Sequence, residues 1–414
     1  MYLAGRPGDL PATLLLDASV IDDPYDFYRR LVAEAPVWRV PDTDIVVVSS
    51  FEAVTEVVSR VDDFSSNLCA IVYRGPLGTP ALFPFDGGGL QTLAIADPPV
   101  HARHRSTVFP ELVARRMAAL RTDIEALAEE RLSEALSGPR FEAMHQLADA
   151  IPIRVVSRLI GFEAADPTQL LAAAFDSTAM LAATQSLDEI HAAMGRSAQV
   201  VGWIGDQLLR AVEGASDGIL GAIGAAVAAG DLDFGEGLVI MHTLLSAGGE
   251  STTSLLGSAI HMLAVNPELQ ARLREAPHLV APFVEEALRL ESPFRYHMRH
   301  ATRATEVRGV PIAAGSTVLL FWGAANRDPA EYDCPDDVVL DRPTPKHHLA
   351  FGRGIHFCVG APLARLEAEI VLTRLLARTQ HFTLDPDRAP RRVSSLVVRR
   401  FAALPLVAAA SREA

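Results

Sequence analysis

Residues 351–360 read Phe-Gly-Arg-Gly-Ile-His-Phe-Cys-Val-Gly, and this stretch decides the fold. Its glycines, at positions 352, 354 and 360, permit tight backbone turns around a single cysteine. Residues 361–378 have helical spacing, so Cys358 lies just before a predicted helix. The N–H groups and the dipole at the start of a helix favour a thiolate. The sequence therefore predicts a thiolate held in a tight loop.

This loop admits three interpretations. An isolated cysteine is most often a buried structural residue, but here ten residues fit one pattern at once. A cysteine hydrolase built on Cys358 and His356 would lack a third, orienting group, because the two residues sit so close together in a tight loop. A thiolate in such a loop suits axial ligation of haem iron, which is the interpretation we favour.

The loop matches every fixed position of the pattern Phe-Gly-x-Gly-x-His-x-Cys-x-Gly. The chain thereby resembles the cytochrome P450 family of haem-thiolate monooxygenases, in its soluble bacterial, actinobacterial-type branch. The resemblance extends over nearly the whole chain and implies haem b as the cofactor, with Cys358 as the ligand of the iron. The loop residues that it places at the haem are Phe351, Gly352, His356 and Gly360.

Two further motifs fit the same family. Glu286-Ala287-Leu288-Arg289 matches its Glu-x-x-Arg, which alone is a weak signal because acid–arginine pairs at this spacing are common on helix surfaces. Arg342 would complete a buried ion-pair triad that braces the haem side, since a buried guanidinium needs its donors satisfied. The resemblance also implies contacts to the haem propionates from His101, Arg105, Arg299 and His356.

The segment 244–253 lies in a long predicted helix and carries the oxygen-side residues. Ala247, Gly248 and Glu250 match the family pattern Ala-Gly-x-(Asp/Glu)-Thr, but Ser251 stands where threonine is usual and Thr252 follows one position later. Small residues would leave room for dioxygen, a hydroxyl would hydrogen-bond the bound oxygen, and the acid would relay protons. Serine lacks the methyl group that holds the threonine rotamer, which puts coupling efficiency in doubt.

A large apolar pocket with few polar anchors is expected for the substrate. The resemblance draws its walls from several segments, and the predicted lining residues are Leu82, Phe83, Leu244, Phe294, Arg295 and Leu396. Strand-like alternation after the Glu-x-x-Arg helix would send Arg295 and His297 to one side. If Arg295 faces the pocket, the substrate carries a carboxylate or another acceptor; a buried or rim ion pair is the alternative.

The coarse pattern predicts a mainly α protein with a small β-sheet portion, organised as a single cytochrome P450 domain over residues 1–414. Haem would lie between the long oxygen helix and the helix that follows the cysteine loop. β-rich contributions are expected near 36–50 and 305–322, and a long irregular loop over 62–96. The predicted helices are 51–59, several within 101–210, 237–265, one starting at Pro267 with Asn266 as its N-cap, 282–290 and 361–378.

Composition excludes several classes of protein. The chain has 414 residues, a formal net charge of −14 and 49% hydrophobic residues, which is globular and too acidic for a general nucleic-acid binder. Three scattered cysteines fit a reducing cytosol, and the N-terminus has no apolar core like that of a signal peptide. The most apolar stretch, 238–265, has Glu250 near its middle, so we expect a cytoplasmic protein without a membrane span.

The function expected from the resemblance is insertion of one atom of O2 into an apolar organic substrate, by hydroxylation or epoxidation. The resemblance implies separate redox partners, so we expect electrons to come from NAD(P)H through a ferredoxin and a ferredoxin reductase. The arginines that we expect to flank the thiolate side as a docking surface are Arg103, Arg115, Arg116, Arg353 and Arg365. A peroxide-driven peroxygenase and a non-catalytic haem or ligand sensor are the alternatives. Glu250 in the acid position disfavours the peroxygenase, and retention of the acid, Ser251 and the propionate positions together disfavours the sensor.

Overall fold

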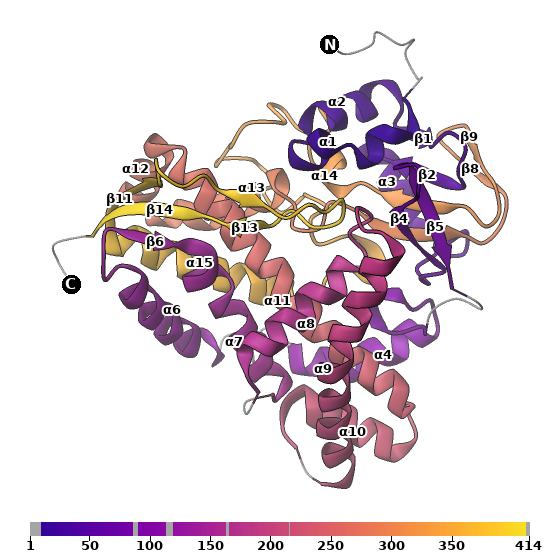
Figure 1. Cartoon of the computed structure of the whole chain (residues 1–414), viewed down its shortest axis with the longest axis horizontal. Helices are drawn as coiled ribbons and strands as arrows, with labels where there is room; N and C mark the ends of the chain where they lie inside the picture. Colours follow the sequence, from indigo (N-terminus) through magenta and orange to yellow (C-terminus); the bar gives the residue numbers. More distant parts are fainter. Residues whose placement is uncertain (1–9, 86–89, 113–118, 163–164, 215, 411–414) are drawn as a thin grey trace.

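The computed structural model describes residues 10–85, 90–112, 119–162, 165–214 and 216–410, and Figure 1 traces them from the N-terminus to the C-terminus. Most of the described residues are helical. The helices are α1 (Ala18–Asp22), α2 (Tyr25–Glu34), α3 (Phe51–Ser59), α4 (Val100–Val108), α6 (Arg121–Ala135), α7 (Ala150–Ile160), α8 (Pro167–Ala179), α9 (Leu187–Glu213), α10 (Gly218–Ala229), α11 (Phe234–Ala264), α12 (Pro267–Glu275), α13 (Val280–Leu290), α14 (Trp322–Ala325) and α15 (Ala361–Arg378). Short 3-10 turns connect several of them, and a π-helical turn occupies Met144–Ala148.

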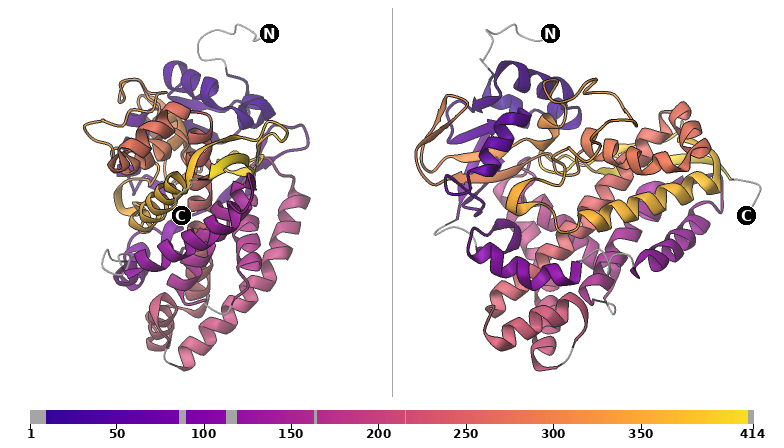
Figure 2. Two further views of the ribbon diagram at one scale, coloured as in Figure 1. Left: turned by 90° about the vertical axis from the view of Figure 1, so that its left-hand side faces the viewer. Right: turned by 180° about the vertical axis from the view of Figure 1, so that it is seen from behind.

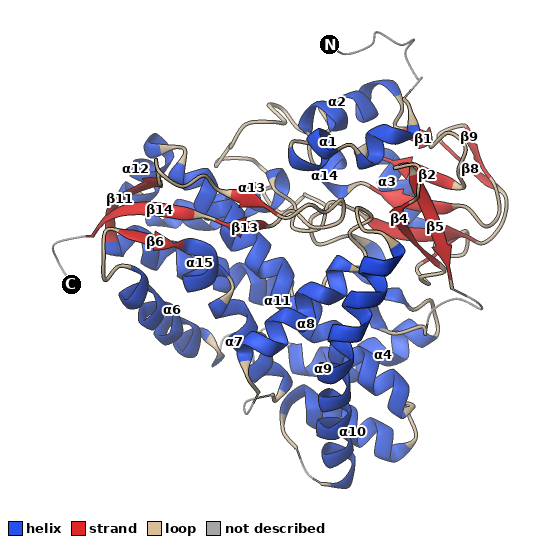
Figure 3. Ribbon diagram, viewed as in Figure 1, coloured by secondary structure: helices blue, strands red, loops and turns tan. Residues whose placement is uncertain are grey.

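The strands are short. They are β1 (Val37–Arg39), β2 (Ile45–Val48), β3 (Phe64–Ser65), β4 (Ala70–Arg74), β5 (Pro80–Pro84), β6 (Arg140–Glu142), β7 (His297–Ala301), β8 (Thr305–Val307), β9 (Val310–Ile312), β10 (Thr317–Leu320), β11 (Thr379–Leu384), β12 (Arg391–Arg392), β13 (Phe401–Ala403) and β14 (Pro405–Ala410). Figure 3 shows them gathered into a larger group on one side of the molecule and a smaller group on the other, with helices between.

The main sheet joins strands that are far apart in the sequence. Its order is β1-β2-β10-β7-β3, and β2 pairs in parallel with β10, so that Ile45 lies opposite Thr317. The predicted β-rich segment near 36–50 therefore meets the end of the one near 305–322 in this sheet, while β8 and β9, from the start of the latter, form a separate hairpin. Because strands so distant in sequence share hydrogen bonds, the sheet ties the amino-terminal part of the chain to its carboxyl-terminal half.

The predicted irregular loop over 62–96 is partly wrong. Within it β4 and β5 form an antiparallel hairpin, with Ile71 opposite Phe83. The β-branched and aromatic residues of β4 suit a pleated ladder, and Gly78 turns the hairpin with a φ of +76°. Gly78, one of the glycines that suggested an irregular loop, thus marks a hairpin turn. The three consecutive glycines at 87–89 lie outside the described residues.

The central helix is α11, which starts three residues before its predicted beginning. Asp233 and Glu236 form a capping box there, which satisfies free N–H groups of the first turn. At 31 residues the helix spans about 46 Å. It runs through the middle of the molecule and packs against α8 and α9, which lie in front of it in Figure 1; Figure 2 gives two further views. The predicted N-cap of α12 is confirmed, because the Asn266 side chain accepts a hydrogen bond from Leu269 N–H at 3.0 Å.

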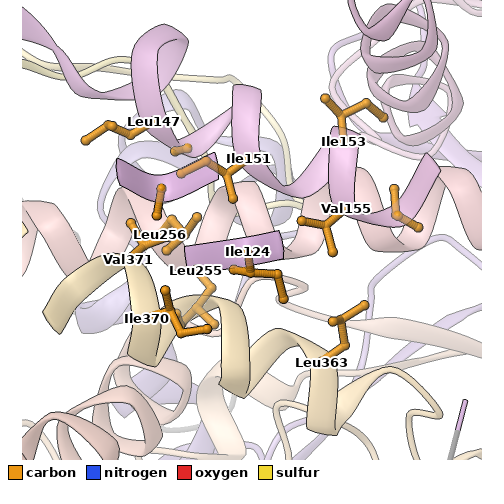
Figure 4. Close-up of a cluster of buried hydrophobic side chains, with 14 of the residues drawn as sticks. Ile124, Leu147, Ile151, Ile153, Val155, Leu255, Leu256, Leu363, Ile370 and Val371 are labelled. Carbon is orange, nitrogen blue, oxygen red and sulfur yellow. The ribbon is translucent and has the colours of Figure 1, made fainter. Parts of the chain in front are cut away.

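The largest hydrophobic cluster packs α11 between α7 and α15 (Figure 4). Leu147 and Ile151 come from one side, Val371 from the other, and Leu255 and Leu256 of α11 lie between them; all five are buried. This packing fixes α11 relative to α15, the helix that follows the cysteine loop. Among the described residues no single helix is both long and apolar enough to cross a membrane. Only α9 and α10 taken together reach that length and apolar composition, and they are bent by 67° relative to each other.

Candidate active site

The cysteine loop has the backbone geometry that its glycines predict. Gly352 and Gly354 have φ values of +66° and +71°, in the left-handed region that a side chain strains. Cys358 N–H donates to the Phe351 carbonyl at 2.9 Å, which closes the loop. Burial raises the pKa of the Cys358 thiol, and hydrogen bonds from the Gly360 and Ala361 N–H groups oppose that effect by stabilising a thiolate.

Two arginines brace this loop from neighbouring helices. Arg105 of α4 donates to the carbonyls of Ile355 and Phe357 at 3.1 and 3.0 Å. Arg365 of α15 lies with its guanidinium carbon 4.5 Å from the centre of the Phe351 ring, and it makes a bidentate ion pair with Glu285 at 2.7 and 3.0 Å. The position of Cys358 is therefore fixed by side chains from both flanking helices.

The predicted triad is assembled and buried. Arg289 holds Glu286 with two hydrogen bonds of 2.7 and 2.9 Å, and Arg342 Nε reaches the same carboxylate at 2.9 Å. The remaining Arg289 donors bond backbone carbonyls, and Val339 N–H bonds Glu286 at 2.8 Å. Because these donors and acceptors are satisfied, the triad locks α13 to the segment that leads to the cysteine loop.

Three of the predicted propionate residues lie close together. The rings of His101 and His356 have centroids 4.3 Å apart, and His356 Nε2 lies 2.9 Å from the Ser66 hydroxyl. Burial, then the nearby Arg299, lowers the pKa of His356 to about 3. His356 Nδ1 is buried with no hydrogen-bond partner among the described residues. Arg105, the fourth predicted residue, is engaged with the loop carbonyls.

Arg299 is the cation of this cluster. Its one side-chain hydrogen bond within the described part of the chain goes to the Met298 carbonyl at 2.8 Å, although a guanidinium has five donors. Burial lowers its pKa to about 10, and Asp97 opposes the shift. A half-buried arginine without a carboxylate partner among the described residues is costly, so this position suits an anionic group from a ligand.

His297 is a further polar group at this place. Its Nδ1 accepts a hydrogen bond from Trp322 Nε1 at 2.7 Å, which assigns the ring proton to Nε2. Burial lowers the pKa of His297 to about 4, so the ring is neutral and Nε2–H is free to donate. The ring of Phe294 lies 5.2 Å away. The sequence indicated His297 only through strand alternation and gave no sign of the Trp322 bond.

One stripe of α11 keeps accessible surface in the middle of a largely buried helix. Leu244, Ala247, Gly248 and Ser251 follow the spacing that aligns residues on one helix face, and each is partly or fully accessible. The Ser251 hydroxyl donates to the Ala247 carbonyl at 2.6 Å. Thr252 is buried at 4% exposure, so Ser251 provides the accessible hydroxyl.

Gly248 has a packing role that the sequence did not indicate. A Cβ atom there would lie 2.6 Å from Val156 Cγ2, so the absence of a side chain lets α7 approach α11 closely.

Glu250 lies behind this stripe, and its partners come from distant segments. It is 2% exposed, and its Oε1 accepts from Arg400 Nε at 3.0 Å while its Oε2 accepts from the Thr178 hydroxyl. Burial raises the pKa of Glu250, and Arg400 and Thr178 counteract part of the rise.

The predicted pocket residues divide into two groups. Leu82, Phe83 and Phe294 are half-buried, and Leu82 and Phe294 pack at the edge of a second hydrophobic cluster. Leu396 and Arg295 are each only 2% exposed. Leu396 is part of the interior of that cluster, so it offers almost no surface to a ligand.

The alternation argument for Arg295 is wrong, because Phe294 and Arg295 pair with residues 397–398, a different neighbour from the strands that pair with β7. Burial lowers the pKa of the Arg295 guanidinium to about 10, and the nearby phenol of Tyr28 opposes part of this shift. The three guanidinium nitrogens are buried without a partner among the described residues.

The predicted docking arginines are also divided. Arg353 is exposed, whereas Arg103 pairs with Glu236 and Arg365 is committed to Glu285. Arg115 and Arg116 lie outside the described residues.

These observations fit a haem-thiolate protein. Cys358 receives two backbone donors, Arg299 and His356 offer unsatisfied polar atoms for propionates, and an accessible stripe of small residues lies on α11. Residues 225–400 match the family described as Cytochrome P450.

The chain is 40% identical over 397 residues to Cytochrome P450 144 of Mycobacterium tuberculosis, covering 95% of this chain and 91% of that protein. It is 32% identical over 369 residues to the Beta-dihydromenaquinone-9 omega-hydroxylase of the same organism, covering 87% and 71%. Its fold matches cytochrome P450 CYP109Q5 from Chondromyces apiculatus with a TM-score of 0.81 and 29% identity, covering 96% and 98%. The chain therefore belongs to the cytochrome P450 family, with a bacterial, actinobacterial-type sequence, the single-domain P450 fold and haem as its cofactor.

Proposed function

We propose that this chain is a monooxygenase that hydroxylates or epoxidises an apolar organic substrate, with electrons from NAD(P)H delivered by a ferredoxin and its reductase. Membership of the cytochrome P450 family makes it a haem monooxygenase; the substrate class and the electron donor are the proposal. The observation that carries it is the accessible stripe of α11, with the Ser251 hydroxyl on it and the buried Glu250 behind it.

Bound haem supplies the activation of dioxygen, and the residues of this chain prepare the site for it. Cys358 is the ligand of the iron, with its thiolate stabilised by the N–H groups of Gly360 and Ala361. Arg299 and His356 hold the propionates. Leu244 and Phe294 orient an apolar substrate, and His297 Nε2–H is a polar donor near them.

The oxygen-side residues have separate tasks in this proposal. Ala247 and Gly248 keep the helix face open. Ser251 places a hydroxyl on this face; its proton goes to the Ala247 carbonyl in the structure and would turn toward a ligand bound on this face. Glu250 holds a proton and releases it inward. Burial raises the pKa of Glu250, which favours the protonated form of this carboxyl.

The electron donor is expected to dock beside the cysteine loop. Phe357 and Ile355 of the loop are exposed, as is Phe109 at the end of α4, and Arg353 adds a cation. Exposed apolar side chains beside a cation suit an acidic carrier with an apolar centre, such as a ferredoxin. Three scattered cysteines suit a reducing compartment, so we propose that this chemistry takes place in the cytoplasm.

The first experiment is the carbon monoxide difference spectrum of the reduced, purified protein. The strongly red-shifted band that names the family would support thiolate ligation by Cys358; the absence of a haem band would overturn the site. A panel of sterols, terpenoids, fatty acids and aromatic polyketides is then tested for shifts of the haem spin state. A ligand that also accelerates NADH consumption, with product formed, supports a monooxygenase, whereas binding without turnover would indicate a sensor.

A further inference from the structure

Glu250 has a second carboxyl group as a neighbour, on a different element. Asp149, which follows the π-helical turn, is 5% exposed. The carbonyl of the preceding Ala148 accepts a hydrogen bond from the Thr253 hydroxyl of α11 at 2.8 Å, which brings this segment against the helix of Glu250. The charge of Asp149 raises the pKa of Glu250. Arg400 acts on both carboxyl groups: it bonds Glu250 at 3.0 Å and lowers the pKa of Asp149. One guanidinium, with 11% of its side chain exposed, therefore serves two buried acids, which favours one retained proton on the pair.

Asp149 also connects this pair to the surface. Its Oδ2 lies 3.0 Å from Nδ1 of His145, whose side chain is 72% exposed. Its Oδ1 is buried and has no hydrogen-bond partner among the described residues. Asp149 N–H bonds the Met144 carbonyl at 2.7 Å, five residues back, so the π-helical turn sets the direction of this side chain.

We propose that His145 and Asp149 form a proton-entry route that supplies Glu250, with Arg400 as the counter-ion shared by the two carboxyl groups. The proposal rests on the proposed monooxygenase function. The overall reaction, RH + O2 + 2 e⁻ + 2 H⁺ → ROH + H2O, consumes two protons in every turnover. The ring of His145 accepts a proton from water and passes it from Nδ1 to Asp149 Oδ2; rotation of the carboxyl group turns that proton toward Glu250.

The charges around the route agree with this direction. Burial raises the pKa of Asp149, and Arg400 and His145 oppose that shift. Glu142, whose carboxylate accepts from His145 N–H at 2.7 Å, raises the pKa of Asp149 further. From α8, which packs against α11, the Thr178 hydroxyl donates a hydrogen bond to Glu250. The groups that face the route are therefore one cation, Arg400, and the carboxyl groups of Glu142, Asp149 and Glu250. The excess of carboxyl groups stabilises a proton that enters here.

The test uses the reconstituted holoenzyme, its redox partners and a substrate found in the panel. The Asp149→Asn variant is expected to form about tenfold less product per NADH in the reaction with O2, with more hydrogen peroxide released. His145→Gln, on the surface, is expected to show a smaller loss in the same direction. The matched control is His278→Gln, because His278 is exposed and pairs with no carboxylate in the described structure. Hydrogen peroxide as the oxidant brings both protons, so product formation with peroxide stays at the wild-type level.

Infrared spectroscopy of the haem-free and haem-bound protein gives a readout that is independent of turnover. A carboxylic acid C=O band at neutral pH that is lost in Asp149→Asn or Glu250→Gln supports a proton held by the pair. Unchanged infrared bands together with wild-type coupling in Asp149→Asn and His145→Gln would overturn the route, as would an equal loss with peroxide and with O2. Should the wild-type protein form no product with any electron donor, the proposed function fails, while the infrared test still decides whether the pair holds a proton.

Discussion

Removal of Arg342 provides a graded test of the buried triad. In Arg342→Met, Glu286 loses one charge-assisted hydrogen bond but keeps both bonds from Arg289 and the N–H of Val339. The other two Arg342 donors bond carbonyls on the exposed side, which water can satisfy. A hydrogen bond to a charged group contributes about 1.5–3 kcal/mol, so we expect a loss of about 2–3 kcal/mol in the free energy of unfolding.

Arg289→Met should cost more. This side chain is 1% exposed. Without it three backbone carbonyls lose this donor, and Glu286 keeps only the bonds from Arg342 and Val339. Breaking a buried ion pair from one side costs about 3–5 kcal/mol, and total stabilities are typically about 5–15 kcal/mol. We therefore expect Arg289→Met to retain little haem.

The assay is urea unfolding of each variant, followed by circular dichroism and by haem absorbance, with equal slopes required before midpoints are compared. Arg29→Met is the control, because the side chain of Arg29 is 54% exposed and its ion pair with Asp336 lies at the surface; a change below about 0.5 kcal/mol is expected there. If Arg342→Met matched this control, the triad would not stabilise the fold in the way that its geometry indicates.

Three further results are expected. Burial alone would raise the pKa of Glu291, but Arg399 and Arg392 lower it from 4.5 to about 2. This adds about 3 kcal/mol to the free energy of unfolding, which is complete above pH 4.5 and is lost as the pH falls toward 2. Acid unfolding of Glu291→Gln, followed by circular dichroism, should lack this pH dependence. Gly354→Ala places a side chain at a φ of +71° and should lower stability by about 1–2 kcal/mol and weaken haem retention; unchanged thermal unfolding would contradict this. Ser251→Ala should lower product per NADH and raise hydrogen peroxide, whereas wild-type coupling in that variant would transfer the role to Thr252 or to water.

The sequence predicted those parts of the site that are contiguous motifs. The cysteine loop has a local geometry set by glycine backbone angles, so its spacing alone identifies it. The Glu-x-x-Arg pair follows helix periodicity and is identified only together with that loop. The stripe of Leu244, Ala247, Gly248 and Ser251 also follows from the helical period once α11 is recognised.

What the sequence missed depends on tertiary contacts between distant segments. Thr178 and Arg400 meet Glu250 only because α8 and the segment before β13 are folded onto α11, and no local pattern near residue 250 indicates them. Arg295 and Leu396 were predicted to line the pocket from their positions in the chain, but the packing of the second hydrophobic cluster decides where their side chains lie.

The pairing of β2 with β10 has a consequence for how the chain folds during synthesis. Thr317 lies about 270 residues after its partner Ile45, and ribosomes add roughly 5–20 residues per second. The first hairpin must therefore wait roughly 15–55 s before its neighbour in the sheet exists. During that interval the edge of β2, made of Ile45 and three valines, is an unpaired apolar template. Early recruitment of a chaperone to the nascent chain would protect this edge, and slowing elongation between these strands should increase aggregation.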